Sequence, residues 1–237
     1  MNEKKRKILL IIGPESSGTR IFTDILSQHP KILGTKNAST HIDILDDFWD
    51  FIEKNEIKKA VKIFPNFDDY EYILTRRSMP HGQKVNEAAK YMKFPNLKGF
   101  YQVCKLMNFK LLILITTRSV VANLLSWTHQ RASAEGSFKK ASIQYREAYK
   151  FLFSFINQNN IPFYFVSLEA FILDTHDYLN SIFQLIDLSN IKMEIKERRD
   201  VNEKRYFSFF KGNLDKPKSL KKDIFNYFKF KFYKILK

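Results

Sequence analysis

Short apolar runs alternate along this chain with longer segments in which apolar residues recur every three or four positions. The short runs predict buried strands at 7–12, 70–75, 110–116 and 161–166. The longer segments predict helices at 20–28, 83–92, 97–108, 120–130, 138–159 and 174–186. Strands that alternate with helices are typical of the α/β class. We therefore expect three layers, with a mostly parallel central sheet and helices on both of its faces.

No internal repeat or low-complexity linker interrupts this pattern, which predicts a single domain over residues 1–237. Only the tail from about residue 216 differs, because it is rich in lysine and phenylalanine. Its apolar residues recur at helical spacing, at Ile224, Phe228, Phe232 and Ile235. Such a tail is typical of a terminal helix that packs its aromatic stripe onto the domain, which we expect. A peripheral membrane contact is the alternative.

A loop of small residues follows the first predicted strand, at 13–20, and leads directly into a helix. Backbone N–H groups at such a position point toward one spot, where the helix dipole favours an anion. The ATP-binding P-loop needs Lys and then Ser or Thr after its last glycine. Here Thr19 and Arg20 follow Gly18, so the hydroxyl that would hold magnesium is missing. The loop predicts an anion site without a metal; an ordinary strand-to-helix turn is the alternative.

A second group of polar residues follows the predicted strand at 110–116. Arg118 lies at the carboxyl end of that strand, and Ser126 lies eight residues later on the following helix. Eight residues are close to two helical turns, so both side chains can face the same direction. An arginine fork and a hydroxyl are suited to a phosphate group. The alternative is a surface arginine followed by a neutral helix position.

These two motifs resemble those of the PAPS-dependent sulfotransferases, enzymes that use 3′-phosphoadenosine 5′-phosphosulfate. The residues that match the loop of that family are Pro14, Ser17, Gly18 and Thr19. The resemblance runs from about residue 7 to residue 188 and implies a P-loop-like sulfotransferase fold. It also implies that this loop binds the 5′-phosphosulfate of PAPS, while Arg118 and Ser126 bind its 3′-phosphate. The product would be adenosine 3′,5′-bisphosphate.

The chain departs from the family pattern at Ser16, where the family usually has a basic residue. That residue stabilises the leaving group, so its loss also allows a sulfotransferase-like fold without activity. Arg20, in the first helical turn, is our candidate to replace it. A later segment, at 161–188, resembles the late strand and helix of the family, and we expect Glu169 there to be structural.

The acceptor side needs a base near the sheet edge where α/β proteins bind ligands. We favour His81, which lies in the polar segment 76–82; His41 and the carboxylate Asp43 are alternatives. Arg76 and Arg77 are expected to contact acceptor or sulfuryl oxygens. By analogy with the family, the acceptor would be a hydroxyl of a small molecule or glycan.

The net charge of +15 favours an anionic partner, but it does not distinguish a cofactor from a glycan, a membrane surface or nucleic acid. We expect no nucleic acid. The single cysteine, Cys104, and the lack of a run of about 18 apolar residues predict a cytoplasmic protein. Membrane association through the tail is the alternative. The competing functions are a P-loop kinase or nucleotide hydrolase and a non-catalytic module that binds anions or nucleic acid.

Overall fold

The computed structural model describes residues 6–34, 41–64, 69–79, 94–130 and 137–191. These residues all belong to the first of two compact units, Met1–Lys196 and Glu197–Lys237. The basic tail from about residue 216, and the helix expected at 83–92, lie outside the described residues. That the whole chain forms one domain therefore stays a prediction.

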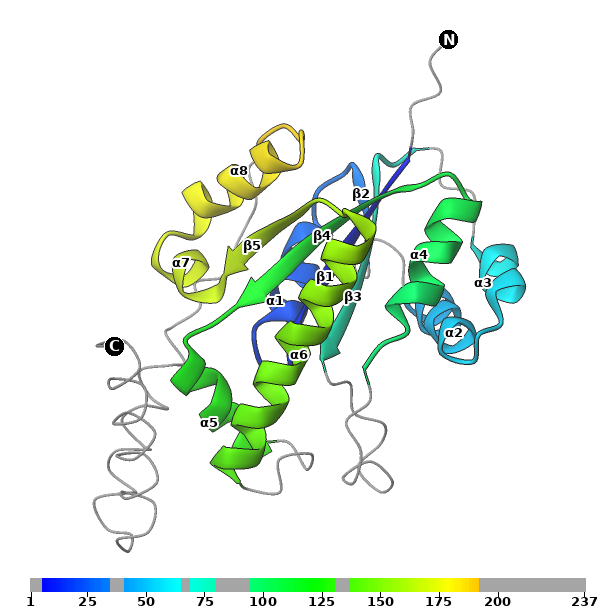
Figure 1. The fold of residues 1–237 in the computed structure, drawn as a ribbon. Coiled ribbons are helices and arrows are strands. Elements are labelled where there is room, and N and C mark those ends of the chain that lie inside the picture. The colour runs from blue at the N-terminus through cyan, green and yellow to red at the C-terminus, as the bar shows by residue number, and fades with distance from the viewer. Residues whose placement is uncertain (1–5, 35–40, 65–68, 80–93, 131–136, 192–237) are drawn as a thin grey trace, which may run out of the picture. The chain divides into compact units, whose positions relative to one another are not determined.

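The centre of the described unit is a parallel sheet of five strands in the order β2-β3-β1-β4-β5 (Figure 1). The strands are β1 (Lys7–Pro14), β2 (Ile32–Leu33), β3 (Tyr72–Met79), β4 (Lys110–Thr117) and β5 (Phe163–Ser167). β1 is the central strand and is buried along almost its whole length. The four apolar runs that predicted strands all form strands, and the α/β class is confirmed.

Helices cover both faces of this sheet. They are α1 (Thr19–Leu26), α2 (His41–Glu53), α3 (Ile57–Ile63), α4 (Leu97–Leu106), α5 (Val120–Gln130), α6 (Phe138–Asn159), α7 (Leu168–Leu173) and α8 (Thr175–Leu185). Leu9 and Ile11 of β1 belong to one core, with residues of α1, α7 and α8. Ile8, Leu10 and Ile12 belong to the other, with residues of α2, α3, α4 and α6. Alternate residues of a strand face opposite sides, which explains why strands buried on both faces are apolar throughout.

The structure corrects the expected limits of β3. The segment 76–79 was expected to lie in a loop, but β3 continues through Arg76 and Arg77 to Met79. Its backbone pairs with β1 in register, with Ile11 opposite Arg76 and Ile12 opposite Arg77. The extension could not be predicted from the apolar pattern, because the residues at the end of this strand are polar. Side chains at the end of a strand need not be buried on both faces of the sheet.

The strand order creates a change of direction in the middle of the sheet. The chain leaves β1 toward β2, on one side, whereas it leaves β4 toward β5, on the other. In open α/β sheets, ligands bind outside the carboxyl ends of the strands at such a switch point. The carboxyl ends of β1 and β4 are where a ligand site is expected.

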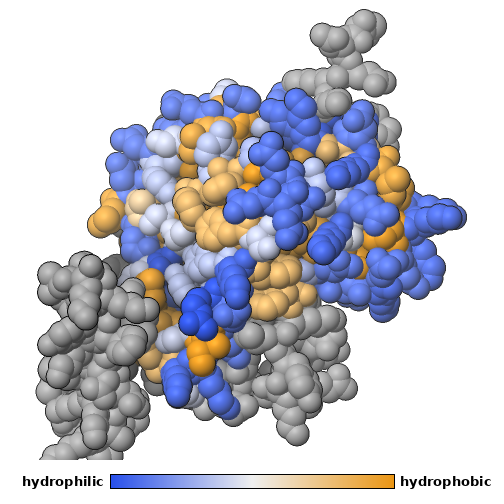
Figure 2. Space-filling model, in the orientation of Figure 1, coloured by the Kyte–Doolittle hydropathy of each residue, from blue (hydrophilic) through white to orange (hydrophobic). Residues whose placement is uncertain are grey.

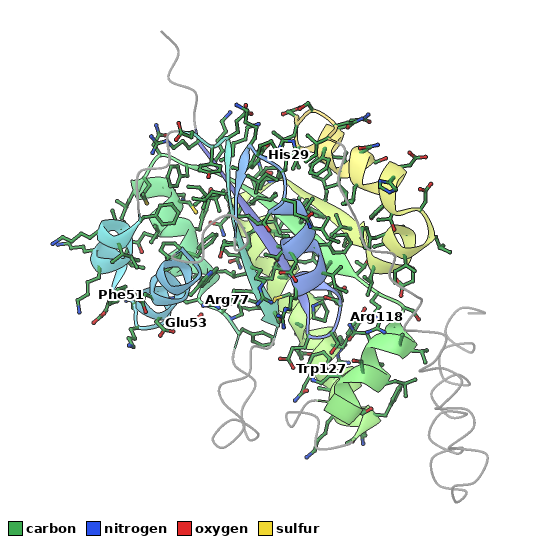
Figure 3. All side chains as sticks on the ribbon, turned by 180° about the vertical axis from the view of Figure 1, so that it is seen from behind. His29, Phe51, Glu53, Arg77, Arg118 and Trp127 are labelled. Carbon is green, nitrogen blue, oxygen red and sulfur yellow. The ribbon has the colours of Figure 1, made fainter. Side chains whose placement is uncertain are left out.

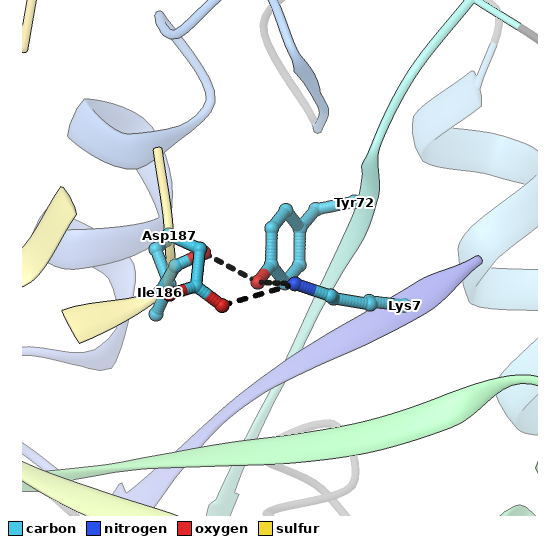
Figure 4. Close-up of polar contacts among 4 residues, drawn as sticks. All are labelled: Lys7, Tyr72, Ile186 and Asp187. Atoms are coloured by element: carbon cyan, nitrogen blue, oxygen red, sulfur yellow. Dashed lines mark hydrogen bonds and ion pairs between the residues drawn. The ribbon is translucent and has the colours of Figure 1, made fainter. Parts of the chain in front are cut away.

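A polar cluster lies at the amino ends of β1 and β3, at the other end of the sheet (Figure 4). Lys7 Nζ donates to the hydroxyl of Tyr72 at 3.0 Å and lies 3.4 Å from the carboxylate of Asp187. The Tyr72 hydroxyl donates in turn to the backbone carbonyl of Ile186 at 2.5 Å. These bonds join β1 and β3 to the segment that follows α8. Burial opposes the charge of Lys7, but its hydrogen bonds and attraction to Tyr72 and Asp187 outweigh burial and raise its pKa.

Apolar residues reach the surface over β5 and the neighbouring part of α6 (Figure 2). Phe165 is 52% exposed and Tyr164 is 37% exposed. The Phe165 ring contacts Phe153 of α6 and Phe163, with ring centres 6.1 Å and 5.6 Å apart. Among the described helices, none is long and apolar enough to span a bilayer.

Candidate functional site

The loop after β1 turns sharply before it enters α1. Ser16 and Gly18 both have positive φ angles, of 66° and 100°. Glycine adopts such an angle without strain, which explains its presence at position 18. The Ser17 backbone N–H donates to the carbonyl of Pro14 at 3.1 Å and closes the turn. Gly18 is the N-cap of α1 and supplies no side-chain cap, so the first amides of this helix are left for another acceptor.

Close packing joins this loop to β4. The hydroxyls of Ser17 and Thr116 are hydrogen-bonded at 2.6 Å in a buried position. A Cβ atom on Gly13 would collide with Thr116 Oγ1 and would lie 2.7 Å from Ser17 Oγ. Gly13 is therefore needed so that the end of β1 can approach β4 this closely.

The loop is also fastened to β3, on its other side. The Glu15 backbone N–H donates to the carbonyl of Met79 at 3.2 Å. The hydroxyl of Thr19, at the start of α1, lies 3.3 Å from the hydroxyl of Ser78. Sequence analysis identified neither Ser78 nor Thr116. Both residues lie near the carboxyl ends of predicted strands. Because the carboxyl ends of parallel strands meet at one edge of the sheet, this position could have indicated that they lie near the loop.

Arg118 joins the two sequence motifs. Its side chain is 8% exposed, and its Nη1 donates to the backbone carbonyl of Ser16 at 3.1 Å. Ser126, two turns along α5, is 3% exposed. Figure 3 shows Arg118 at the same end of the sheet as Arg77, while His29 lies at the opposite end. The arginine and the loop, far apart in sequence, thus form one polar site at the carboxyl ends of β1 and β4.

Glu169 supports this arrangement from α7. Its carboxylate accepts a hydrogen bond from the Ser119 backbone N–H at 2.8 Å. Ser119 precedes α5, so the contact fixes the start of the helix that carries Ser126. The contact supports the start of α5; that Glu169 is only structural stays a prediction.

Arg20 forms an ion pair on the surface of α1. Its side chain is 80% exposed and its Nε is 3.8 Å from the carboxylate of Asp24, one turn further along α1. An exposed ion pair of this kind contributes little and can rearrange when another anion approaches. Its role as a replacement for the missing basic residue stays a prediction.

Arg76 and Arg77 point to opposite faces of the sheet, because they are neighbours on one strand. Arg76 is exposed, on the face that α1 covers. The guanidinium of Arg77 lies 4.3 Å from the ring centre of Trp49 in α2. The Trp49 ring is itself stacked on Phe100 at 4.7 Å.

Trp49 is held in place by more than stacking. Its Nε1–H donates to the Thr75 hydroxyl at 2.7 Å, and the side chain is 1% exposed. Trp49 was missed by sequence analysis. The helical spacing of Phe48, Trp49 and Ile52 was the signal, although the surrounding aspartates obscured it.

The histidines proposed as bases cannot be placed in this site. His81 lies outside the described residues. His41 is the first residue of α2, but the described part of the structure does not include its side chain or that of Asp43. Within the described residues, no group of three or more His, Cys, Asp or Glu side chains is arranged to hold a metal ion.

Comparison with known proteins gives no family assignment. No family model matches the chain, and no curated protein matches it. The site must therefore be interpreted from its own residues.

Proposed function

We propose that this protein is a sulfotransferase that transfers the sulfuryl group of PAPS to a hydroxyl acceptor. The observation that carries the proposal is the hydrogen bond from Arg118 to the Ser16 carbonyl. It joins the two motifs that resemble the sulfotransferases, although 102 positions separate them. Any two loops that follow neighbouring parallel strands lie at the same edge of the sheet, so the support comes from the direct bond between the buried guanidinium and the loop.

The fold offers a second line of support. We propose that it is a P-loop-like sulfotransferase fold, because a loop joins the central strand β1 to α1 at the switch point beside β4. The first amides of α1 supply hydrogen-bond donors for an anion. The hydroxyls of Ser17 and Thr19 add two more when Thr116 and Ser78 are the donors in the bonds that join them.

The residues at this edge fit a ligand with two anionic ends. The segment from Pro14 through Ser16 to Thr19 would hold the 5′-phosphosulfate, and Arg118 with Ser126 would hold the 3′-phosphate. Arg118 has five N–H donors, and the Ser16 carbonyl uses one of them. When bound, PAPS would supply the activated sulfuryl group. Since Arg118 and Ser126 are both buried, side chains that cover them must move when a ligand binds.

The remaining roles belong to groups around the acceptor. Cations must face the sulfuryl oxygens and the leaving phosphate as charge develops there. Arg20 and Arg77 are our candidates, with Arg77 oriented by Trp49. His81, or alternatively His41, would accept the proton of the acceptor hydroxyl. We propose a saccharide hydroxyl as acceptor.

Two other functions predict different ligands. A P-loop kinase or nucleotide hydrolase would prefer ATP with magnesium, but Thr19 and Arg20 replace its Lys and Ser/Thr. A non-catalytic module for nucleic acid or an anionic membrane would show steep salt dependence and would tolerate changes in the loop. The overall positive charge and the aromatic residues of the basic tail are the features that favour this last function.

Thermal unfolding with added nucleotides separates these functions. Adenosine 3′,5′-bisphosphate, without magnesium, should raise the melting temperature more than ATP with magnesium. At about 100 times its Kd, a ligand stabilises the native state by roughly 2.7 kcal/mol. A preference for ATP with magnesium would favour the kinase, and no response to either nucleotide would reject both enzymes.

A further inference from the structure

Asn123, in α5, carries a buried side-chain amide. Its side chain is 0% exposed, and neither Oδ1 nor Nδ2 has a partner among the residues that the structure describes. Its backbone N–H donates to the carbonyl of Ser119 at 2.8 Å. Most buried side-chain amides are hydrogen-bonded, so an exception calls for a specific explanation.

The position of Asn123 on the helix connects it to the proposed cofactor site. Residues three and four apart share a face of an α-helix, so Ser119, Asn123 and Ser126 form one polar stripe. The stripe begins next to Arg118, which contacts the phosphate loop. Other residues of α5 are apolar and buried: Ala122, Leu124, Leu125 and Trp127. A helix this deeply buried would be expected to carry an apolar residue at position 123 as well.

The chemistry of the amide indicates what could satisfy it. A carboxamide needs a donor for Oδ1 and an acceptor for Nδ2. A phosphate dianion has acceptors only, so the 3′-phosphate could satisfy Nδ2 but not Oδ1. In adenosine 3′,5′-bisphosphate, the ribose 2′-hydroxyl is the neighbour of the 3′-phosphate and can donate to Oδ1.

We propose that Asn123 is a third nucleotide-binding residue of this site and that it recognises the ribose 2′-hydroxyl beside the 3′-phosphate. The inference rests on the proposed function, because it assumes that Arg118 and Ser126 bind the 3′-phosphate. It adds a preference for a ribonucleotide over a 2′-deoxyribonucleotide. Asn123 is buried, as are Arg118 and Ser126, so side chains that cover it must also move when a nucleotide binds.

Calorimetry with two nucleotides tests the inference. The full chain is titrated with adenosine 3′,5′-bisphosphate and with 2′-deoxyadenosine 3′,5′-bisphosphate. The wild-type protein should bind the ribonucleotide about tenfold more tightly, the scale expected for one hydrogen bond to a buried group. Asn123→Leu should bind both equally, with an affinity no higher than that of the wild type for the deoxynucleotide, because it also loses the Nδ2 donor to the 3′-phosphate. Asn157→Leu makes the same change at an exposed position of α6 and should keep the preference.

The outcomes separate this inference from the proposed function. If the wild-type protein binds both nucleotides with equal affinity, or if Asn123→Leu keeps the preference, the inference is wrong and the proposed function stands. If the wild-type protein binds neither nucleotide, both are wrong. If Asn123→Leu fails to fold, the inference is still tested by the affinities of the wild-type protein and of Asn123→Ser for the two nucleotides. Without ligand, Asn123→Leu should have a higher melting temperature, because it removes an unpaired buried amide.

Discussion

Arg118 donates a hydrogen bond to the backbone carbonyl of Ser16, across a distance of 3.1 Å. The donor follows β4 and the acceptor follows β1, two strands that lie side by side in the sheet. A buried guanidinium is thereby fixed next to the loop whose amides lead into α1. Together with the bond between Ser17 and Thr116, this contact holds the two halves of the proposed site against each other.

Replacing Arg118 tests the 3′-phosphate site. Arg118→Ala should weaken binding of adenosine 3′,5′-bisphosphate by about 2–5 kcal/mol, the usual loss when one partner of a buried charged pair is removed. Binding of adenosine 5′-phosphate, which lacks the 3′-phosphate, should change much less. Arg146→Ala removes an exposed arginine of α6 and serves as the control. Equal losses for both nucleotides would place the 3′-phosphate elsewhere.

Arg20 is expected to act on turnover rather than on binding. If its side chain turns from Asp24 to the leaving phosphate, Arg20→Ala should lower kcat by about 10²–10³, the effect of losing one transition-state donor. Binding of adenosine 3′,5′-bisphosphate should weaken far less, because the loop amides remain. A sulfuryl-transfer assay beside calorimetry distinguishes these effects.

Asp24→Asn is the matched control for Arg20, since it removes the ion pair and keeps the arginine. Its kcat should remain at or above the wild-type value. Unchanged turnover and binding in Arg20→Ala would mean that Arg20 is only a surface residue, and Arg77 would become the main candidate.

Trp49 is predicted to orient Arg77. Trp49→Phe removes the bond to Thr75 and part of the aromatic surface under the guanidinium, and it should cost about 1–3 kcal/mol of stability. If Arg77 binds the acceptor, the KM for the acceptor should also rise. Phe183→Leu changes a fully buried residue of α8 on the other face of the sheet. This control should lower the melting temperature and leave the acceptor KM unchanged.

The cluster of Lys7, Tyr72 and Asp187 predicts loss of stability in alkali. The pKa of Lys7 is raised, and burial raises the pKa of Tyr72, partly offset by Lys7. A raised folded-state pKa gives stability that is fully present below the unfolded value, here about 10 for both groups, and is lost as the pH rises through the folded value. Chemical denaturation between pH 8 and 11 should therefore show a fall in the free energy of unfolding above about pH 10.

Tyr72→Phe tests the origin of this pH dependence. The variant should be less stable at pH 8, by about 0.5–1.5 kcal/mol for each of the two hydrogen bonds that the hydroxyl makes, and should lose less stability at high pH. Tyr164→Phe, at an exposed position of β5, should behave like the wild type. An identical alkaline fall in Tyr72→Phe would assign the effect to other groups.

The sequence was most informative where strands are buried on both faces. Runs such as 7–12 and 110–116 are apolar throughout, and this pattern located β1 and β4 correctly. Three kinds of feature were not predicted from the sequence. β2 has only two residues, α2 is rich in aspartate, and the end of β3 is polar. In each case, tertiary pairing or packing provides the stability that local sequence does not indicate.

For the site, sequence placed Gly18 and Arg118 at the ends of strands, and the structure brings the two motifs together. The sequence did not indicate the directions in which these side chains point. The pairing of Arg20 with Asp24 and the stacking of Arg77 on Trp49 depend on neighbours that only the folded chain supplies. The burial of the Asn123 amide also has no signature in sequence, because burial is a property of packing.

The central place of β1 has a consequence for biosynthesis. This first strand pairs with β3 at Lys7 and Tyr72 and with β4 at Lys7 and Lys110, so one of its edges stays unpaired until β4 has left the ribosome. At about 5–20 residues per second, the interval between β1 and β4 amounts to several seconds. During this time the nascent chain exposes an apolar strand that is prone to aggregation. We therefore expect that this protein needs a chaperone to bind the nascent chain during synthesis. In a series of stalled ribosomes, β1 should become protected from protease only when the nascent chain is long enough for β4 to have left the ribosome.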